Sequence, residues 1–240
     1  MEDFSKNIFS PYYHKGNAAG IAINLIRFSV SNFNQCDVLK ELDYLESTLS
    51  RKLTRADIEK IGKIAFNKPV DYFRIIFCFE NYCKAILLVN SYLINNIENT
   101  ETSNEIKKMS KNQKNKPILL NDFLAQSHWK KDTSGLYYLD FLKKETITFS
   151  TILKDSYMDV IKLPSKIIDF LRVINFERNN IHYFASLSFS NSIEFINNLR
   201  LLNSFVNNDM ILFNDNLVIE NKNIPNRHII NEFKRKIMDK

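Results

Sequence analysis

The sequence predicts an all-α protein, and two observations support this fold class. Glycine and proline, the residues that most often interrupt helices, number only 4 and 5 in a chain of 240 residues. Apolar side chains recur at intervals of three and four in most segments, which gives a helix one apolar face. The composition, 45% hydrophobic and 25% charged, is typical of a globular protein. Because no internal repeat or long linker is present, we expect one domain with additions at its ends.

The first 69 residues are predicted to form a helical extension. Residues 17–32 have helical spacing, and Asp37 is a suitable cap for a second helix. Thr54 and Asp57 have the layout of a capping box, in which the two side chains cap the first turn of a helix reciprocally. Near Pro69 we expect the chain to break and restart.

Residues 70–98 are apolar on nearly every side, which is typical of a central, buried helix. The polar segment 99–116 has few apolar residues and is predicted to be a mobile surface loop. Its lysines could contact RNA backbone or could simply be solvated. The candidate contacts are Lys107, Lys108, Lys111 and Lys114.

The second half of the chain continues the helical pattern. We expect a short helix within 117–129, a turn at 132–135, a helix that begins at Pro164 and an amphipathic helix over 190–207. Residues 136–158 have mixed periodicity. Two apolar runs, 210–213 and 217–219, flank a polar Asn-Asp-Asn and are typical of a small β-hairpin. A basic helix is expected over 226–240, so the predicted division is 1–69, 70–208 and 209–240.

Charge and cysteine content narrow the function classes. The net charge of +6 suits a phosphate-bearing partner, although a mild excess of lysine without any partner explains it equally well. The three cysteines lack metal-ligand spacing and are predicted to be reduced core thiols of a cytoplasmic protein. The longest apolar run, 75–94, contains four polar residues, so we expect a buried helix and no membrane association. The sequence lacks a phosphate-binding glycine loop, a nucleophile elbow and zinc-ligand spacing, and we expect no cofactor or metal.

Two polar pairs interrupt otherwise apolar helical faces. Arg178 and His182 lie four residues apart on the stripe that is formed by Ile167, Phe170, Leu171, Ile174 and Ile181. Glu80 and Lys84 repeat this anomaly on the helix over 70–98, on the stripe of Phe73, Ile76, Phe77 and Leu87. A buried guanidinium without a partner costs several kcal/mol. We therefore predict a polar pocket in which Glu80 and Lys84 support Arg178 and His182.

The segments Glu80–Leu87, Leu163-Pro164 and Glu177–Tyr183 resemble the motifs of HEPN domains over residues 70–208. The resemblance implies an up-and-down helical bundle that dimerises, so that two copies of the Arg–His motif line one cleft. Active members are metal-independent endoribonucleases, often toxins or antiviral-defence effectors. Three residues separate Arg178 from His182, fewer than in the usual family pattern, and this spacing keeps both side chains on one helical face.

The residue types fit RNA cleavage. Histidine can accept the proton of a 2′-hydroxyl or donate one to the leaving 5′-oxygen, which yields a 2′,3′-cyclic phosphate. Arginine binds phosphate oxygens, and Asn179 could donate a further hydrogen bond. The resemblance implies RNA and a second copy of the chain as partners, with an antitoxin or defence-system protein as another. Two alternatives remain: a non-catalytic adaptor that binds RNA, a nucleotide or a protein, and a purely structural Arg178–Glu80 ion pair with His182 bonded into the core.

Overall fold

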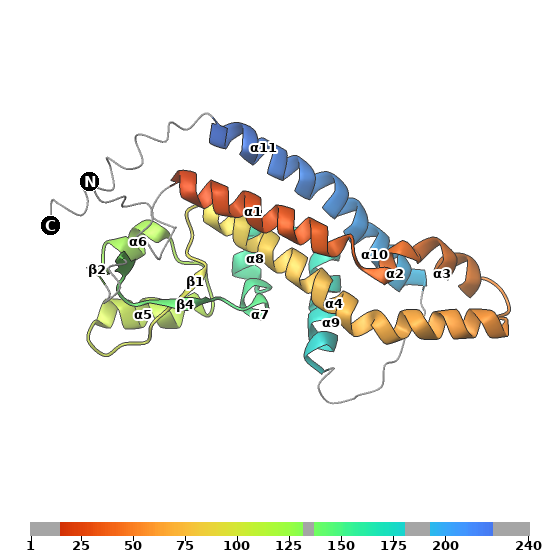
Figure 1. Cartoon of the computed structure of the whole chain (residues 1–240). Coiled ribbons are helices and arrows are strands. Elements are labelled where there is room, and N and C mark those ends of the chain that lie inside the picture. Colours follow the sequence, from red (N-terminus) through yellow and green to blue (C-terminus); the bar gives the residue numbers. More distant parts are fainter. Residues whose placement is uncertain (1–14, 132–136, 181–192, 223–240) are drawn as a thin grey trace. The chain divides into compact units, whose positions relative to one another are not determined.

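The computed structural model describes residues 15–131, 137–180 and 193–222, which are mostly helical with two small antiparallel sheets (Figure 1). The predominantly helical prediction is confirmed. The chain divides into two compact units that interleave along the sequence. The helical unit comprises Ile26–Tyr82 and Lys162–Asn214, and the mixed unit comprises Met1–Leu25, Cys83–Ile161 and Asp215–Lys240. No helix in the described ranges combines the length and apolarity that a membrane crossing requires.

The helical unit combines complete helices with segments of three helices whose other residues belong to the mixed unit. Its elements are the second part of α1 (Lys15–Phe33), α2 (Asp37–Lys40), α3 (Leu42–Leu49), the first part of α4 (Arg55–Val89), α9 (Ser165–Asn180), α10 (Ile193–Phe205), the π-helical turn Val206–Met210 and the start of α11 (Ile211–Lys222). Aromatic rings pack between these helices. The ring centroid of Phe79 in α4 lies 6.3 Å from that of Phe33 in α1 and 6.0 Å from that of Phe205 in α10. Burial of such rings is the main stabilising term in a core of this kind.

The start of α4 confirms the capping box. The Thr54 amide donates to a carboxylate oxygen of Asp57 at 2.8 Å, and the Asp57 amide donates to the Thr54 hydroxyl at 3.2 Å. The predicted break near Pro69 is wrong, because α4 continues through it to Val89. A proline within a helix removes one backbone hydrogen bond. Burial of Tyr72, Ile75 and Ile76 directly after it offsets this loss.

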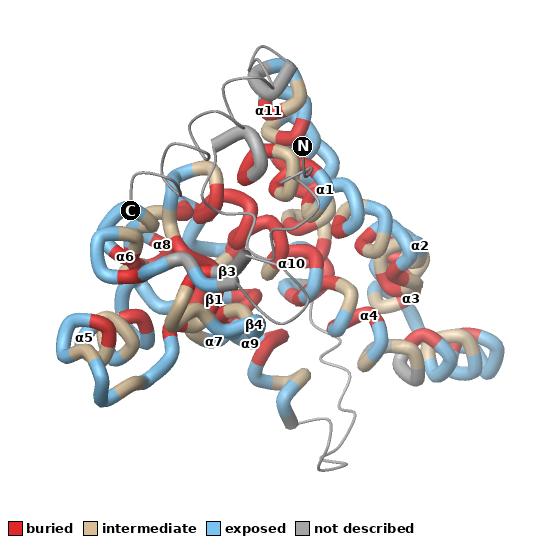
Figure 2. The backbone as a smooth tube through the Cα atoms, turned by 60° about the vertical axis from the view of Figure 1, so that its left-hand side comes forward, coloured by how far each residue is buried: buried red, intermediate tan, exposed pale blue. Residues whose placement is uncertain are grey.

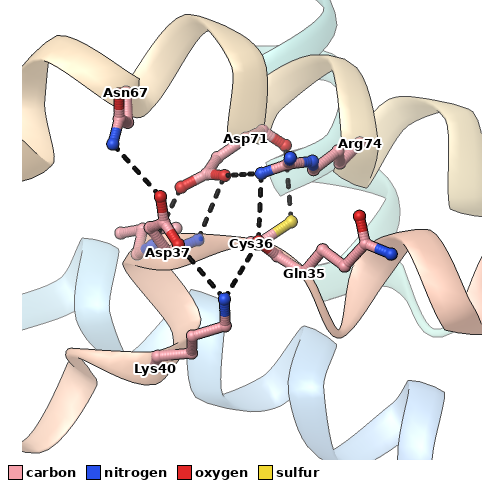
Figure 3. A network of polar contacts seen from close by, with 8 residues as sticks. Gln35, Cys36, Asp37, Lys40, Asn67, Asp71 and Arg74 are labelled. Carbon is pink, nitrogen blue, oxygen red and sulfur yellow. Dashed lines mark hydrogen bonds and ion pairs between the residues drawn. The ribbon is translucent and has the colours of Figure 1, made fainter.

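A buried carboxylate of α4 caps α2 from outside that helix (Figure 3). Asp71 is fully buried, and its two oxygens accept the amides of Asp37 at 3.1 Å and Val38 at 2.8 Å. The residue before α2, Cys36, provides no capping hydrogen bond through its own side chain. Arg74 neutralises Asp71 at 3.2 Å. The first-turn amides of α2 are therefore satisfied by a residue more than thirty positions along the chain.

The mixed unit contains two β-ribbons that the sequence pattern did not predict. Strand β1 (Asn95–Ile97) pairs antiparallel with β4 (Leu142–Thr146), and β2 (Trp129–Lys131) pairs antiparallel with β3 (Tyr137–Leu139). The mixed unit also contains parts of α1, α4 and α11 and four complete helices: α5 (Asn104–Gln113), α6 (Leu120–Leu124), α7 (Phe149–Ile152) and α8 (Asp155–Ile161). Helix α6 confirms the short helix predicted within 117–129.

The prediction of a loop over 99–116 is wrong, because α5 occupies most of it. The Ser103 hydroxyl caps the helix by accepting the Ile106 amide at 3.3 Å. Ile106 and Gln113 are buried, whereas the other residues of α5 are half-buried or exposed (Figure 2). The Gln113 side chain accepts the Ile97 amide at 2.8 Å and donates to the Asn95 carbonyl at 2.7 Å. The oxygen and the nitrogen of the Gln113 side chain therefore both have hydrogen-bond partners, and these two bonds attach α5 to β1.

The predicted hairpin over 210–219 is also wrong, because these residues belong to α11 and the turn before it. Met210, Asn214 and Leu217 are buried at the i, i+4, i+7 spacing of one helical face. The Asn-Asp-Asn that suggested a turn continues the helix. The basic helix expected over 226–240 and the turn expected at 132–135 lie outside the described residues.

Candidate functional site

Helix α9 positions the predicted arginine. Pro164 directly precedes the helix, and its carbonyl accepts the Ile167 amide at 2.9 Å. The predicted apolar stripe is confirmed over its described length: Ile167, Phe170, Leu171 and Ile174 are all buried. Phe170 packs edge-on against Phe195 of α10, with 5.4 Å between ring centroids.

Arg178 continues this stripe at the C-terminal end of α9, but it is half-exposed rather than buried. Its guanidinium carbon lies 5.9 Å from the centroid of the Phe73 ring. Its Nε and Nη2 donate to the Asn179 side-chain oxygen at 3.3 and 3.0 Å. The prediction that Arg178 is a buried cation is therefore wrong. An aromatic face and partial solvation provide the compensation that a core carboxylate was expected to give.

Arg178 lies on an open groove with a volume of about 430 Å³, which we call the Arg178 groove. Residues from three helices line it: Phe28 and Asn32 of α1, Val70, Phe73, Arg74, Phe77 and Glu80 of α4, and Arg178 of α9. Phe28 and Phe77 meet edge to face at 5.6 Å. The residues Phe28, Phe73 and Phe77 are 60%, 46% and 39% exposed.

Both predicted supporting residues belong to α4. Glu80 is half-exposed and lines the groove together with Arg178. Lys84 is buried, and its Nζ donates to the Thr146 hydroxyl of β4 at 2.9 Å. It is not among the residues that line the Arg178 groove. Lys84 therefore has a hydrogen bond within the mixed unit, and Glu80 lines the Arg178 groove of the helical unit.

His182 lies outside the described residues, because the described part of α9 ends at Asn180. The structure thus places Arg178, Asn179 and Glu80 of the predicted site, and the position of the histidine stays a prediction. Within the described ranges, no group of three histidine, cysteine or acidic side chains is arranged to hold a metal ion.

The four predicted RNA-contacting lysines belong to α5 and its C-terminal cap in the mixed unit. At 100° per residue, they occupy one half of the helix, opposite Ile106 and Gln113. Lys107 pairs with Glu101, whereas the other three are exposed. The exposed lysines are Lys108, Lys111 and Lys114. They form a solvated basic face on a helix fixed by Gln113.

Sequence reasoning missed the aromatic lining of the groove. It assigned Phe73 and Phe77 to the same buried stripe as Ile76 and Leu87, but only Ile76 and Leu87 are buried. Because α4 is apolar on nearly every side, its periodicity could not identify the exposed side. A pattern that would have indicated the groove is the clustering of phenylalanine next to Glu80 on one helix.

Comparison with protein-family models, with curated proteins and with solved structures finds no match for this chain. The functional assignment therefore depends on the chemistry of the residues.

Proposed function

We propose that the protein is a metal-independent endoribonuclease that binds the RNA backbone at Arg178. One observation carries this proposal: the Arg178 guanidinium lies over the Phe73 ring, 5.9 Å from its centroid, and is oriented by Asn179 in an open groove. Among the described residues it forms no ion pair with a carboxylate. A half-exposed, oriented guanidinium of this kind can form two parallel hydrogen bonds with a phosphate.

Asn179 adds a second donor to the same place. Its side-chain oxygen already accepts two hydrogen bonds from Arg178. The amide nitrogen is therefore the group left to donate to a ligand, and the residue is exposed. The chain's net charge of +6 favours approach of a polyanion. The exposed lysines of α5 provide a sequence-independent contact with RNA backbone.

His182 is proposed to move the protons. It follows Arg178 by four residues, the interval that keeps two side chains on one face of a helix. As a base, it accepts the proton of the 2′-hydroxyl while that oxygen attacks phosphorus. A second histidine, from another copy of the chain, donates a proton to the 5′-oxygen as its bond to phosphorus breaks. The products are a 2′,3′-cyclic phosphate and a 5′-hydroxyl, and the biological role is that of a toxin or an antiviral-defence effector.

Cleavage is tested with purified protein and end-labelled RNA in the presence of EDTA. We expect His182→Ala to lower the cleavage rate by about 10²- to 10⁴-fold while RNA affinity is retained, because general acid–base catalysis has this magnitude. Arg178→Ala should weaken both binding and cleavage. Arg172→Ala is the matched control, since Arg172 is an arginine of the same helix that pairs with Asp169 and is not among the groove-lining residues.

Cleavage that survives His182→Ala, or that requires a divalent cation, would contradict the proposal. A non-catalytic adaptor is the second candidate, and the exposed phenylalanines of the groove favour it. An adaptor would bind RNA, a nucleotide or a protein equally well with and without His182, and it would leave RNA intact. Expression of the wild-type chain in cells separates the two further, because only a nuclease should lose toxicity on His182→Ala.

A further inference from the structure

We infer that the protein selects RNA by its strand state and not by its sequence, because the Arg178 groove receives the base of an unpaired nucleotide of any identity. This inference rests on the proposed function, since it names the class of RNA that reaches Arg178. It depends on three properties of the groove: its exposed phenylalanines, its size and the position of its cation.

Exposed phenylalanines from two helices line the groove. Phe73 and Phe77 are four residues apart, which places them on one face of α4, about 6 Å apart along its axis. Phe28 of α1 meets Phe77 edge to face at 5.6 Å. All three residues are exposed. Exposure of several large apolar side chains around one groove is typical of a binding site.

A nucleobase fits this lining. The groove volume of about 430 Å³ is within the range of small-molecule sites, about 300–1,000 Å³. Single-stranded RNA is typically recognised by splaying out a base and stacking it on aromatic rings. Such stacking tolerates any sequence, because every base has a π-face. The bases of a duplex stack on one another and offer no free face, so the lining favours a single strand.

The two arginines of the groove have different roles. Arg74 is committed to the fold, since its Nη1 bonds Asp71 at 3.2 Å and the Gln35 carbonyl at 3.0 Å (Figure 3). Arg178 donates only to Asn179 among the described residues, so its other N–H groups can bind the phosphate of the stacked nucleotide. An apolar protein segment in the groove would instead desolvate this cation, which is costly. A nucleotide therefore fits the groove better than such a segment.

Glu80 lies away from the expected phosphate. It follows Phe73 by seven residues, so it lies about two turns and 10 Å further along α4. At this separation, salt at about 0.1 M screens much of the repulsion between a carboxylate and a phosphate. Glu80 also has an interaction within the chain. We therefore expect it to confer no preference among the bases.

The experiment measures fluorescence anisotropy with 2′-O-methyl oligonucleotides, which bind but cannot be cleaved by attack of a 2′-hydroxyl. The probes, at one fixed salt concentration, are a nonamer of mixed sequence, the same nonamer paired with its complement, and the same backbone without bases. We expect the single strand to bind at least about fivefold more tightly than the other two. Nonamers of uridine, cytidine and adenosine should bind within about threefold of one another.

Variants of the groove test which residues are responsible. Phe77→Ala and Phe28→Ala should each weaken binding of the single strand by at least about fivefold and leave the affinity for the backbone without bases unchanged. Arg178→Ala should weaken binding of both probes, because it removes the phosphate contact. Phe176→Ala is the matched control: this phenylalanine of α9 is 69% exposed and is not among the groove-lining residues. Thermal melting of each variant verifies that it is folded.

The outcomes that overturn the inference differ in meaning. Equal binding of the single strand, the duplex and the backbone without bases overturns the inference but leaves the proposed function intact. A strong preference for one base has the same meaning. Absence of binding to any oligonucleotide overturns both. Loss of self-association or of a protein partner in Phe77→Ala and Phe28→Ala, with RNA affinity unchanged, assigns the groove to protein docking instead.

Discussion

Asp71 should be among the most sensitive positions of the helical unit. It is fully buried, and it satisfies the amides of Asp37 and Val38 while it neutralises Arg74. Hydrogen bonds to a charged group contribute about 1.5–3 kcal/mol each. Asp71→Asn retains one acceptor oxygen but loses the charge and one bond, and Arg74 stays partly solvated. We therefore expect Asp71→Asn to lower the free energy of unfolding by about 2–3 kcal/mol and Asp71→Ala by about 3–5 kcal/mol.

Urea denaturation, followed by circular dichroism and fluorescence, measures this loss. The midpoint should fall while the slope of free energy against urea stays constant, because the surface exposed on unfolding is unchanged. Asp169→Asn is the matched control, since this aspartate is 73% exposed in its pair with Arg172. A surface ion pair contributes about 0–1 kcal/mol. A loss below about 1 kcal/mol for Asp71→Asn, or one equal to the control, would refute the assignment of Asp71 as the cap of α2.

Three further predictions concern other parts of the chain. Gln113→Ala should lower stability by about 1–3 kcal/mol, because the Ile97 amide loses its acceptor, and hydrogen exchange at that amide should accelerate; unchanged exchange would contradict the described attachment of α5. Arg51 and the hydroxyl of Thr54 hold the pKa of Asp57 well below its ordinary value. The stability difference between wild type and Asp57→Asn should therefore be complete above about pH 5 and should shrink as the pH falls below about 4, in urea titrations across that range. Burial raises the pKa of Cys36 to about 12, so a thiol reagent at pH 8 should modify the 3 cysteines only after denaturant is added.

Local signals in the sequence predicted the elements whose stabilising contacts are also local. The capping box of Thr54 and Asp57 lies within one helical turn, and it begins α4 as expected. The helices α1, α9 and α10 have a clear apolar stripe over several turns, and each forms near its predicted place. In these segments, propensity, capping and periodicity favour the same structure.

The failures concern segments whose stabilising contacts lie far away along the chain. Nothing within 99–116 indicates that Gln113 will bond β1, so the polar, lysine-rich composition of this segment predicts a loop. The hairpin over 210–219 was predicted from a polar triplet that α11 instead buries through Asn214. Burial against the rest of the unit outweighs weak turn propensity. The same reason explains why Pro69 leaves α4 intact.

The groove shows the corresponding limit for a functional site. Apolar residues surround α4 on nearly every side, so periodicity could not distinguish the buried Ile76 from the exposed Phe73 and Phe77. The anomaly of Arg178 was detectable because a cation in an apolar stripe requires compensation. The ring beneath this cation, that of Phe73, belongs to another helix, so neither helix alone predicts the contact. A charged residue that interrupts an apolar pattern can therefore indicate where a site lies, whereas the tertiary structure determines which side chains complete it.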